Sequence, residues 1–169
     1  MKTLATRGSG VNLAVNSAGA VIISWAVTGM GTFADSGSIL GGLAAPVTVG
    51  APPYKSGATN VALNDAGQAA LAWATSTQNV AATRSAAGTW GTAVALSTVP
   101  AGRLDVAIDG AGDAIAVFGP THLVGSTIIN SVYFSKRPAG GTWSAATILS
   151  APVTQPAAPA PPPMPLGPS

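Results

Sequence analysis

Aspartate is the only acidic side chain that this chain offers for metal binding or acid-base chemistry: it has five aspartates and no glutamate. Asp105, Asp109 and Asp113 lie four residues apart and suggest a calcium loop. Calcium, however, usually takes six to eight oxygen ligands from a denser acidic set. Glycoside hydrolysis by paired carboxylates needs two acids placed for that purpose, whereas three of the five aspartates lie in or beside turns of the repeats. We therefore expect no metal site and no cofactor.

His122 is the only histidine, and the chain has no cysteine. A single histidine cannot supply a histidine-rich metal site, and a Ser-His-Asp arrangement would depend on this one side chain. A histidine in a loop is the simpler interpretation. Without cysteine there are no disulfides and no thiolate ligands. The sequence thus predicts a protein that is not an enzyme.

The elements that would position these side chains repeat three times, over about residues 10–57, 58–102 and 103–150. Each repeat contains an Asx-x-Ala-Gly segment, an aromatic side chain six residues after its glycine, and a later nine-residue block. These features are, in order, 16–19, 64–67 and 109–112; Trp25, Trp73 and Phe118; and 41–49, 88–96 and 141–149. A period near fifty residues indicates one supersecondary unit used three times.

Each repeat predicts four short strands. The first strands (11–15, 59–63, 104–108) alternate in polarity, and an Asx–Gly turn follows, in which glycine supplies a positive φ. The second strands (20–26, 68–74, 113–118) are almost continuously apolar or small, as expected of strands covered on both faces. Helix is the alternative for these alanine-rich runs, but flanking glycines and short lengths disfavour it. The third strands are 31–36, 79–85 and 130–137, and the fourth are 44–49, 92–97 and 145–150. The third repeat has eight extra residues, around 119–126.

Residues 151–169 hold eight prolines and no charge. Because proline lacks a backbone donor, this segment predicts an extended polyproline-II tail that does not pair in a sheet. It is either a linker or a strap that docks on a neighbouring subunit.

The net charge is only +2 and 7% of residues are charged, against roughly a quarter in an average domain. So weak a field disfavours nucleic acid as a partner. No run is apolar enough to predict a membrane span. Residues 1–7 lack the apolar segment of a signal peptide, yet a surface of Ser, Thr, Asn and Gln is typical of exported or virion β proteins. We expect the protein to be located outside the cell, on a cell surface or in a virion.

Segments 106–118 and 137–144 resemble the sialidase-like, Asp-box-like β-propeller repeats of bacterial surface and secreted proteins, and the resemblance covers about residues 10–150. It implies an all-β fold of three four-stranded propeller blades. The chain departs from the pattern at Leu43, where the other repeats have Trp90 and Trp143, and it lacks the Ser-x-Asp start of an Asp-box. Sialidases also need a tyrosine nucleophile backed by glutamate, which is absent, and an arginine cluster. Arg84 and Arg137 occupy equivalent positions in two repeats, so the sequence does not predict that they meet in one arginine cluster.

Closed propellers have four to eight blades, so three blades would leave two apolar faces uncovered. We expect a homo-oligomer, either a dimer that closes a six-bladed ring or a filament, unless further blades belong to a longer protein. The predicted function is a non-catalytic structural and recognition module that self-assembles on a cell surface, extracellular filament or virion. A lectin-like carbohydrate-binding protein and a remnant of a glycoside hydrolase are the alternatives.

A glycan or surface protein is the expected ligand, if there is one. The tryptophans favour filling of the gaps between blades over carbohydrate stacking. Loops that join second to third strands and loops that link repeats should lie on one face, where binding residues are common. The predicted ligand-binding residues there are Tyr54, Lys55, Gln78, Arg103 and His122.

Overall fold

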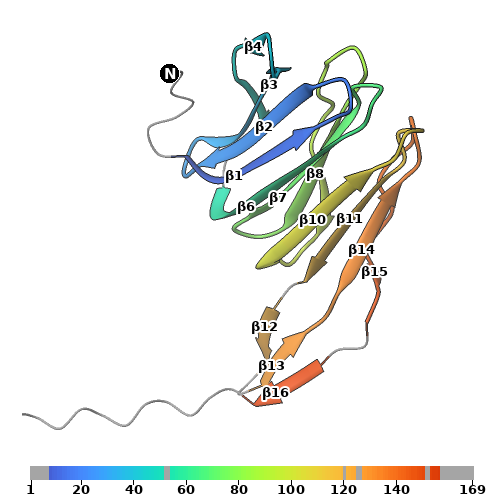
Figure 1. Cartoon of the computed structure of the whole chain (residues 1–169). Coiled ribbons are helices and arrows are strands. Elements are labelled where there is room, and N and C mark those ends of the chain that lie inside the picture. The colour runs from blue at the N-terminus through green and yellow to red at the C-terminus, as the bar shows by residue number, and fades with distance from the viewer. Residues whose placement is uncertain (1–7, 52–53, 120, 125–126, 151–152, 157–169) are drawn as a thin grey trace, which may run out of the picture.

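The computed structural model describes residues 8–51, 54–119, 121–124, 127–150 and 153–156. These residues form an all-β protein with three antiparallel sheets of four to five strands and one smaller sheet (Figure 1). The first sheet consists of β1 (Gly8–Val15), β2 (Ala20–Val27), β3 (Gly31–Ser38), β4 (Gly42–Leu43) and β5 (Val47–Gly50). The second consists of β6 (Tyr54–Leu63), β7 (Ala69–Thr75), β8 (Asn79–Arg84) and β9 (Val94–Ser97). The third consists of β10 (Arg103–Ile108), β11 (Ala114–Gly119), β14 (Tyr133–Arg137) and β15 (Thr147–Ile148).

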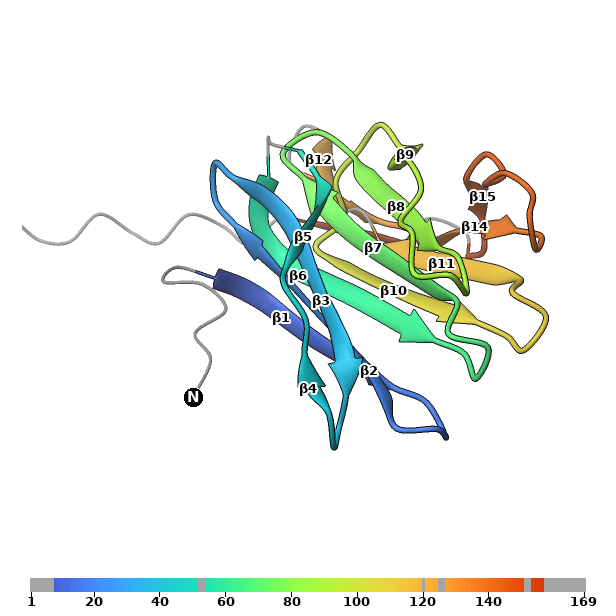
Figure 2. The ribbon, with the colours of Figure 1, turned by 90° about the horizontal axis from the view of Figure 1, so that it is seen from above.

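The first strands of the three sheets, β1, β6 and β10, run side by side, and the sheets fan out from them (Figure 2). In each sheet the chain passes outward from strand to antiparallel strand, as the repeat predicts. The three sheets do not close into a ring within one chain. Within the described ranges no helix has the length and apolar character needed to cross a membrane.

The Asx–Gly turns form as predicted. Gly19, Gly67 and Gly112 have φ values of 74°, 80° and 93°, a region that L side chains rarely adopt. The side-chain Oδ1 of Asn16 accepts a hydrogen bond from the Ala20 amide at 2.9 Å, which fixes the start of β2. The equivalent side chains close the other two turns, Asn64 to the Gln68 amide and Asp109 to the Asp113 amide.

Two apolar clusters fill the spaces between successive sheets. Trp73 and Leu71 belong to the cluster between the first and second sheets, and Phe118 to the cluster between the second and third. β7 is buried along its whole length because it contributes to both clusters. This confirms the prediction of a strand covered on both faces for the second repeat. In the third repeat β11 is buried only at alternate positions, since one face of its sheet has no neighbour.

The prediction that the proline-rich tail stays outside any sheet is wrong for residues 153–156. This segment, β16 (Val153–Pro156), pairs antiparallel with β13 (Thr127–Asn130). Its first three residues are not proline and keep their amide donors, and the strand ends at Pro156, which has none. The remaining tail residues, 151–152 and 157–169, lie outside the described residues.

The eight extra residues of the third repeat account for two differences within that repeat. They lengthen the connection enough to form β12 (Thr121–Val124), which pairs with β13 and completes the small sheet β12-β13-β16. Because Asn130 belongs to β13, the third strand of this repeat begins at Tyr133 rather than at 130. In the first repeat the predicted fourth strand, 44–49, begins later, as β5, and a short strand that the sequence does not predict, β4, precedes it; both pair with β3.

Candidate functional site

On the outer face of the first sheet, β1 exposes apolar side chains at positions that the later repeats bury or partly bury, whereas Val21 and Trp25 on β2 are buried on that face. Val11, Leu13 and Val15 on β1 are 66%, 57% and 46% exposed. The residues that match Leu13 in the next two repeats, Val61 and Val106, are only 7% and 8% exposed, because each packs against the preceding sheet. The first sheet has no preceding sheet in this chain. We call this surface the first open face.

The third sheet leaves the opposite face uncovered. Ile115 on β11 is 40% exposed, whereas the equivalent Ala70 on β7 is fully buried against the third sheet. Asp105 and Ala107 on β10 are exposed on the same side, next to the partly buried Val117. We call this surface the second open face. An isolated chain therefore presents two mainly apolar faces of the kind that its own sheets cover.

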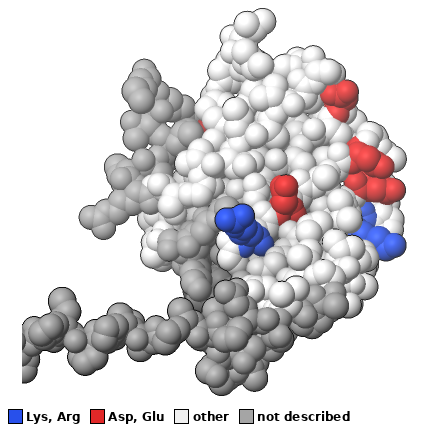
Figure 3. Space-filling view, turned by 60° about the horizontal axis from the view of Figure 1, so that its bottom comes forward, with Lys and Arg blue, Asp and Glu red and all other residues white. Residues whose placement is uncertain are grey.

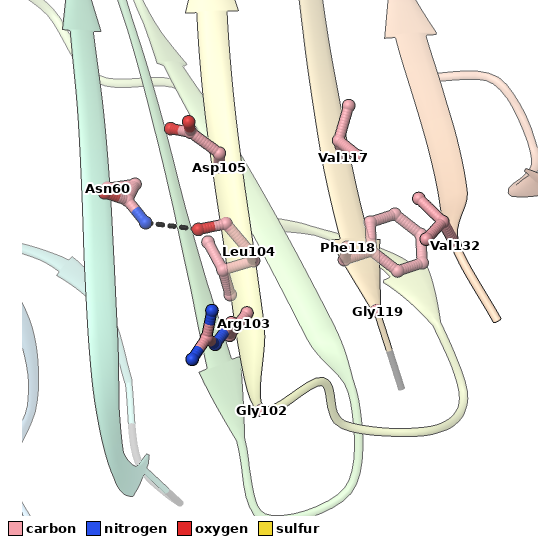
Figure 4. Close-up of a pocket in the computed structure, with 9 residues that line it drawn as sticks. All are labelled: Asn60, Gly102, Arg103, Leu104, Asp105, Val117, Phe118, Gly119 and Val132. Carbon is pink, nitrogen blue, oxygen red and sulfur yellow. Dashed lines mark hydrogen bonds between the residues drawn. The ribbon is translucent and has the colours of Figure 1, made fainter. Parts of the chain in front are cut away.

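A cavity of about 660 Å³ lies where the second and third sheets meet at the start of β10. Figure 4 shows the amide of Asn60 reaching from β6 to the carbonyl oxygen of Leu104, with Arg103 and Asp105 on either side along β10. The residues that line the cavity include Asn60, Arg103, Asp105, Val117, Phe118 and Val132. A guanidinium, a carboxylate and an amide beside apolar surface can orient a small polar ligand or a side chain of a partner.

Of the two predicted ligand-binding residues whose side chains the structure describes, Gln78 and Arg103, Arg103 lines this cavity and Gln78 does not. The backbone nevertheless places all five at corresponding ends of the strands. Tyr54 pairs with Thr75, whose amide donates to the Gln78 carbonyl at 2.8 Å, and Lys55 follows Tyr54 on β6. Arg103 pairs with Gly119 at the same end of the third sheet, and His122 follows on β12 (Figure 1). The side chains of Tyr54, Lys55 and His122 lie outside what the structure describes.

A second cavity, of about 300 Å³, contains both arginines whose convergence the sequence did not predict. Arg84 and Arg137 line it together with Gln68 and Thr89. The Nη1 group of Arg84 donates to the Gly67 carbonyl at 2.9 Å, and burial lowers the pKa of this arginine. Equivalent residues of two repeats meet here because successive sheets stack with their turns in register.

Asparagine side chains connect the successive sheets in a ladder. Asn12 Nδ2 donates to Asn60 Oδ1 at 3.1 Å, Asn12 Oδ1 accepts from the Val61 amide at 3.1 Å, and Asn60 Nδ2 donates to the Leu104 carbonyl. The sequence shows that these residues recur at the same repeat position. It does not show that they bond across sheets rather than within turns.

A second row of asparagines lies at the turns. Asn16 Nδ2 donates to the Asn64 carbonyl at 3.1 Å, and Asn64 Nδ2 donates to the Asp109 carbonyl at 2.8 Å. Each contact between successive sheets, here called a joint, thus contains one such bond at the strand and one at the turn. Asp65 adds a further bond to the first joint: its carboxylate accepts the Ser17 amide at 2.9 Å, and hydrogen bonds from Ser17 lower the pKa of Asp65.

The large aromatic side chains are packing residues. Trp73 and Phe118 are both 2% exposed. Phe118 stacks on Tyr133 with ring centroids 6.1 Å apart, and Trp25 stacks on Phe33 at 5.9 Å. Trp90 and Trp143 are partly buried against the two apolar clusters. These positions favour the structural interpretation over carbohydrate stacking.

Asp109 and Asp113 of the third repeat accept hydrogen bonds from backbone amides. Asp109 Oδ1 accepts three turn amides, and Asp113 Oδ1 accepts the Ala139 amide at 2.6 Å. In the described part of the chain no three His or Asp side chains are grouped to hold a metal ion. No protein-family model matches the sequence, and a comparison with curated proteins gives no significant match.

Proposed function

We propose that this protein is a non-catalytic, propeller-type structural module that self-assembles by covering its two open faces with further copies of itself. The observation that carries the proposal is the exposure of Val11 and Leu13 at positions that the second and third repeats bury, and of Val15 at a position that they partly bury. Water contact at such a surface is unfavourable by roughly 25 cal/mol for each Å² of apolar area. Within the chain, the first sheet covers Val61 and the second sheet covers Val106. The third sheet of a second copy offers the equivalent surface for Leu13.

The low charge of the protein supports the same proposal. The face in Figure 3 is mostly white, with few acidic or basic side chains scattered over it. With a net charge of +2, like-charge repulsion between copies is weak. Three sheets from each of two copies would make a six-bladed ring, whereas a contact that does not close would make a filament. A structural role at a cell surface, in an extracellular filament or in a virion follows as part of the proposal.

The test is the mass of the native chain in solution, measured by size-exclusion chromatography with light scattering across a range of protein concentrations. We expect masses above the 16.4 kDa of one chain, with dissociation only on strong dilution. A species that stays soluble with the mass of one chain at every concentration would refute the proposal.

The 660 Å³ cavity favours a second candidate function, binding of a glycan or another small polar ligand. Glycan-array binding by the native chain, lost on Arg103→Ala and kept on Arg137→Ala, is the expected result. Arg137 is the matched control because it is also an arginine on the third sheet but lines the other cavity. Equal binding by both variants, or no binding to any glycan class, would remove this candidate.

A further inference from the structure

The asparagine ladder changes its chemistry at the last repeat. The position held by Asn12 and Asn60 is occupied by Asp105, and the position held by Asn16 and Asn64 is occupied by Asp109. An asparagine amide both donates and accepts hydrogen bonds, whereas an ionised carboxylate only accepts. The second open face therefore lacks both side-chain donors that each joint inside the chain uses.

The repeat shows what these carboxylates would meet in a joint with a second copy. In the second joint Asn60 donates to the carbonyl of Leu104, and the counterpart of Leu104 in the first sheet is Val11. In the first joint Asn12 donates to the side-chain carbonyl oxygen of Asn60, and the counterpart of Asn60 in the first sheet is Asn12. At the turn, Asn64 donates to the carbonyl of Asp109. The counterpart there is the carbonyl of Asn16. A carboxylate oxygen in place of each amide nitrogen would face a carbonyl oxygen, and two acceptors repel each other.

One bond of the ladder survives this replacement. Asn12 Oδ1 accepts the Val61 amide at 3.1 Å. Asp105 Oδ1 accepts the Val106 amide at 2.8 Å, and its other carboxylate oxygen can accept the amide of Leu13, the equivalent of Val61, from a second copy. The apolar surroundings are also retained. Ala107 and Ile115 stand where Ala62 and Ala70 pack against the third sheet. The contact is thus compatible with a second copy but has fewer hydrogen bonds than the joints inside the chain.

We infer that copies associate head to tail, with the second open face of one copy against the first open face of the next; this inference rests on the proposed function. Asp105 and Asp109 keep this joint weaker than the joints inside the chain. The two aspartates are specificity-determining residues of the interface. They make the addition of copies reversible, where an unbroken ladder would favour continuous growth.

The first experiment restores the missing donors. In the double variant Asp105→Asn, Asp109→Asn the dissociation constant for self-association, measured by sedimentation equilibrium, should fall at least tenfold. Asn16 and Asn64 show that asparagine supports the same turn. Asp113→Asn is the matched control, because it removes a neighbouring charge without adding a ladder donor. Unchanged or weaker association of the double variant, or equal strengthening by the control, would overturn the inference.

The second experiment tests the polarity of the contact and uses the absence of cysteine from the chain. Leu13→Cys and Ala107→Cys place one thiol on each open face. Under oxidising conditions the double variant should form covalent oligomers, and each single variant should not. Cross-linking of a single variant would instead indicate contact between identical faces and would contradict the head-to-tail joint.

The outcomes separate the two proposals. Association of the native chain without cross-linking of the double-cysteine variant would refute the head-to-tail inference alone. Association of the double asparagine variant but not of the native chain would support the role of the aspartates and refute assembly by the native protein. Absence of association in every variant would refute both.

Discussion

Replacement of the exposed apolar residues of β1 by serine should abolish most of the self-association. Val11, Leu13 and Val15 are 66%, 57% and 46% exposed, whereas Val61 and Val106, the buried counterparts of Leu13, keep only 7–8%. Covering the face would thus bury about half of each side chain. Full burial of such a side chain contributes about 1.5–3 kcal/mol, so half-burial of three contributes roughly 3 kcal/mol in total. At 1.4 kcal/mol for each factor of ten, the triple variant should associate on the order of 100-fold more weakly.

Sedimentation equilibrium over a wide concentration range measures this difference directly. The matched control is the double variant Ile39→Ser, Leu40→Ser, which removes apolar side chains that are 65% and 99% exposed in the β3–β4 connection and that belong to neither open face as defined above. Its association should equal that of the native chain. A triple variant that associates as tightly as the native chain would refute the reasoning, because the first open face would then not be the contact.

Two further predictions concern the joints inside the chain. A Cβ atom at Gly50 would lie 2.4 Å from the Trp73 ring, so Gly50→Ala should lower the unfolding free energy by about 1–3 kcal/mol through overpacking; urea denaturation would show this, with Gly102→Ala, where nothing lies within 4 Å, as the near-neutral control. Asp65 has its pKa lowered below 3.8 by hydrogen bonds from Ser17, so it stabilises the folded state above that pH and loses this effect as pH falls through the lowered pKa. The stability difference between the native chain and Asp65→Asn should therefore be present at neutral pH and vanish in strong acid; a difference that persists there would contradict the assignment.

Local signals predict the strands and turns of this protein well. Gly19, Gly67 and Gly112 adopt the positive φ that an Asx–Gly hairpin turn needs. The eight-residue excess of the third repeat lies where β12 begins. These features depend on a few neighbouring residues, so a single sequence contains them. The same holds for β7, whose unbroken run of small and apolar residues matches its burial on both faces.

Contacts between repeats are harder to predict because they depend on how the sheets stack. The recurrence of Asn12 and Asn60 is visible in the sequence, but their hydrogen bond exists only once β1 and β6 lie side by side. Likewise, Arg84 and Arg137 line one cavity because adjacent turns are in register. The pairing of β16 with β13 depends on the small sheet formed by the inserted hairpin. The proline content of residues 151–169 alone predicts that this segment does not pair in a sheet.

Electron cryomicroscopy of the assembled particle would show what covers the first open face. We expect β1 of one copy to pack against β10 and β11 of another, so that each third sheet is followed by a first sheet. Particles made of three sheets with β1 facing solvent, or copies joined through any other surface, would contradict it.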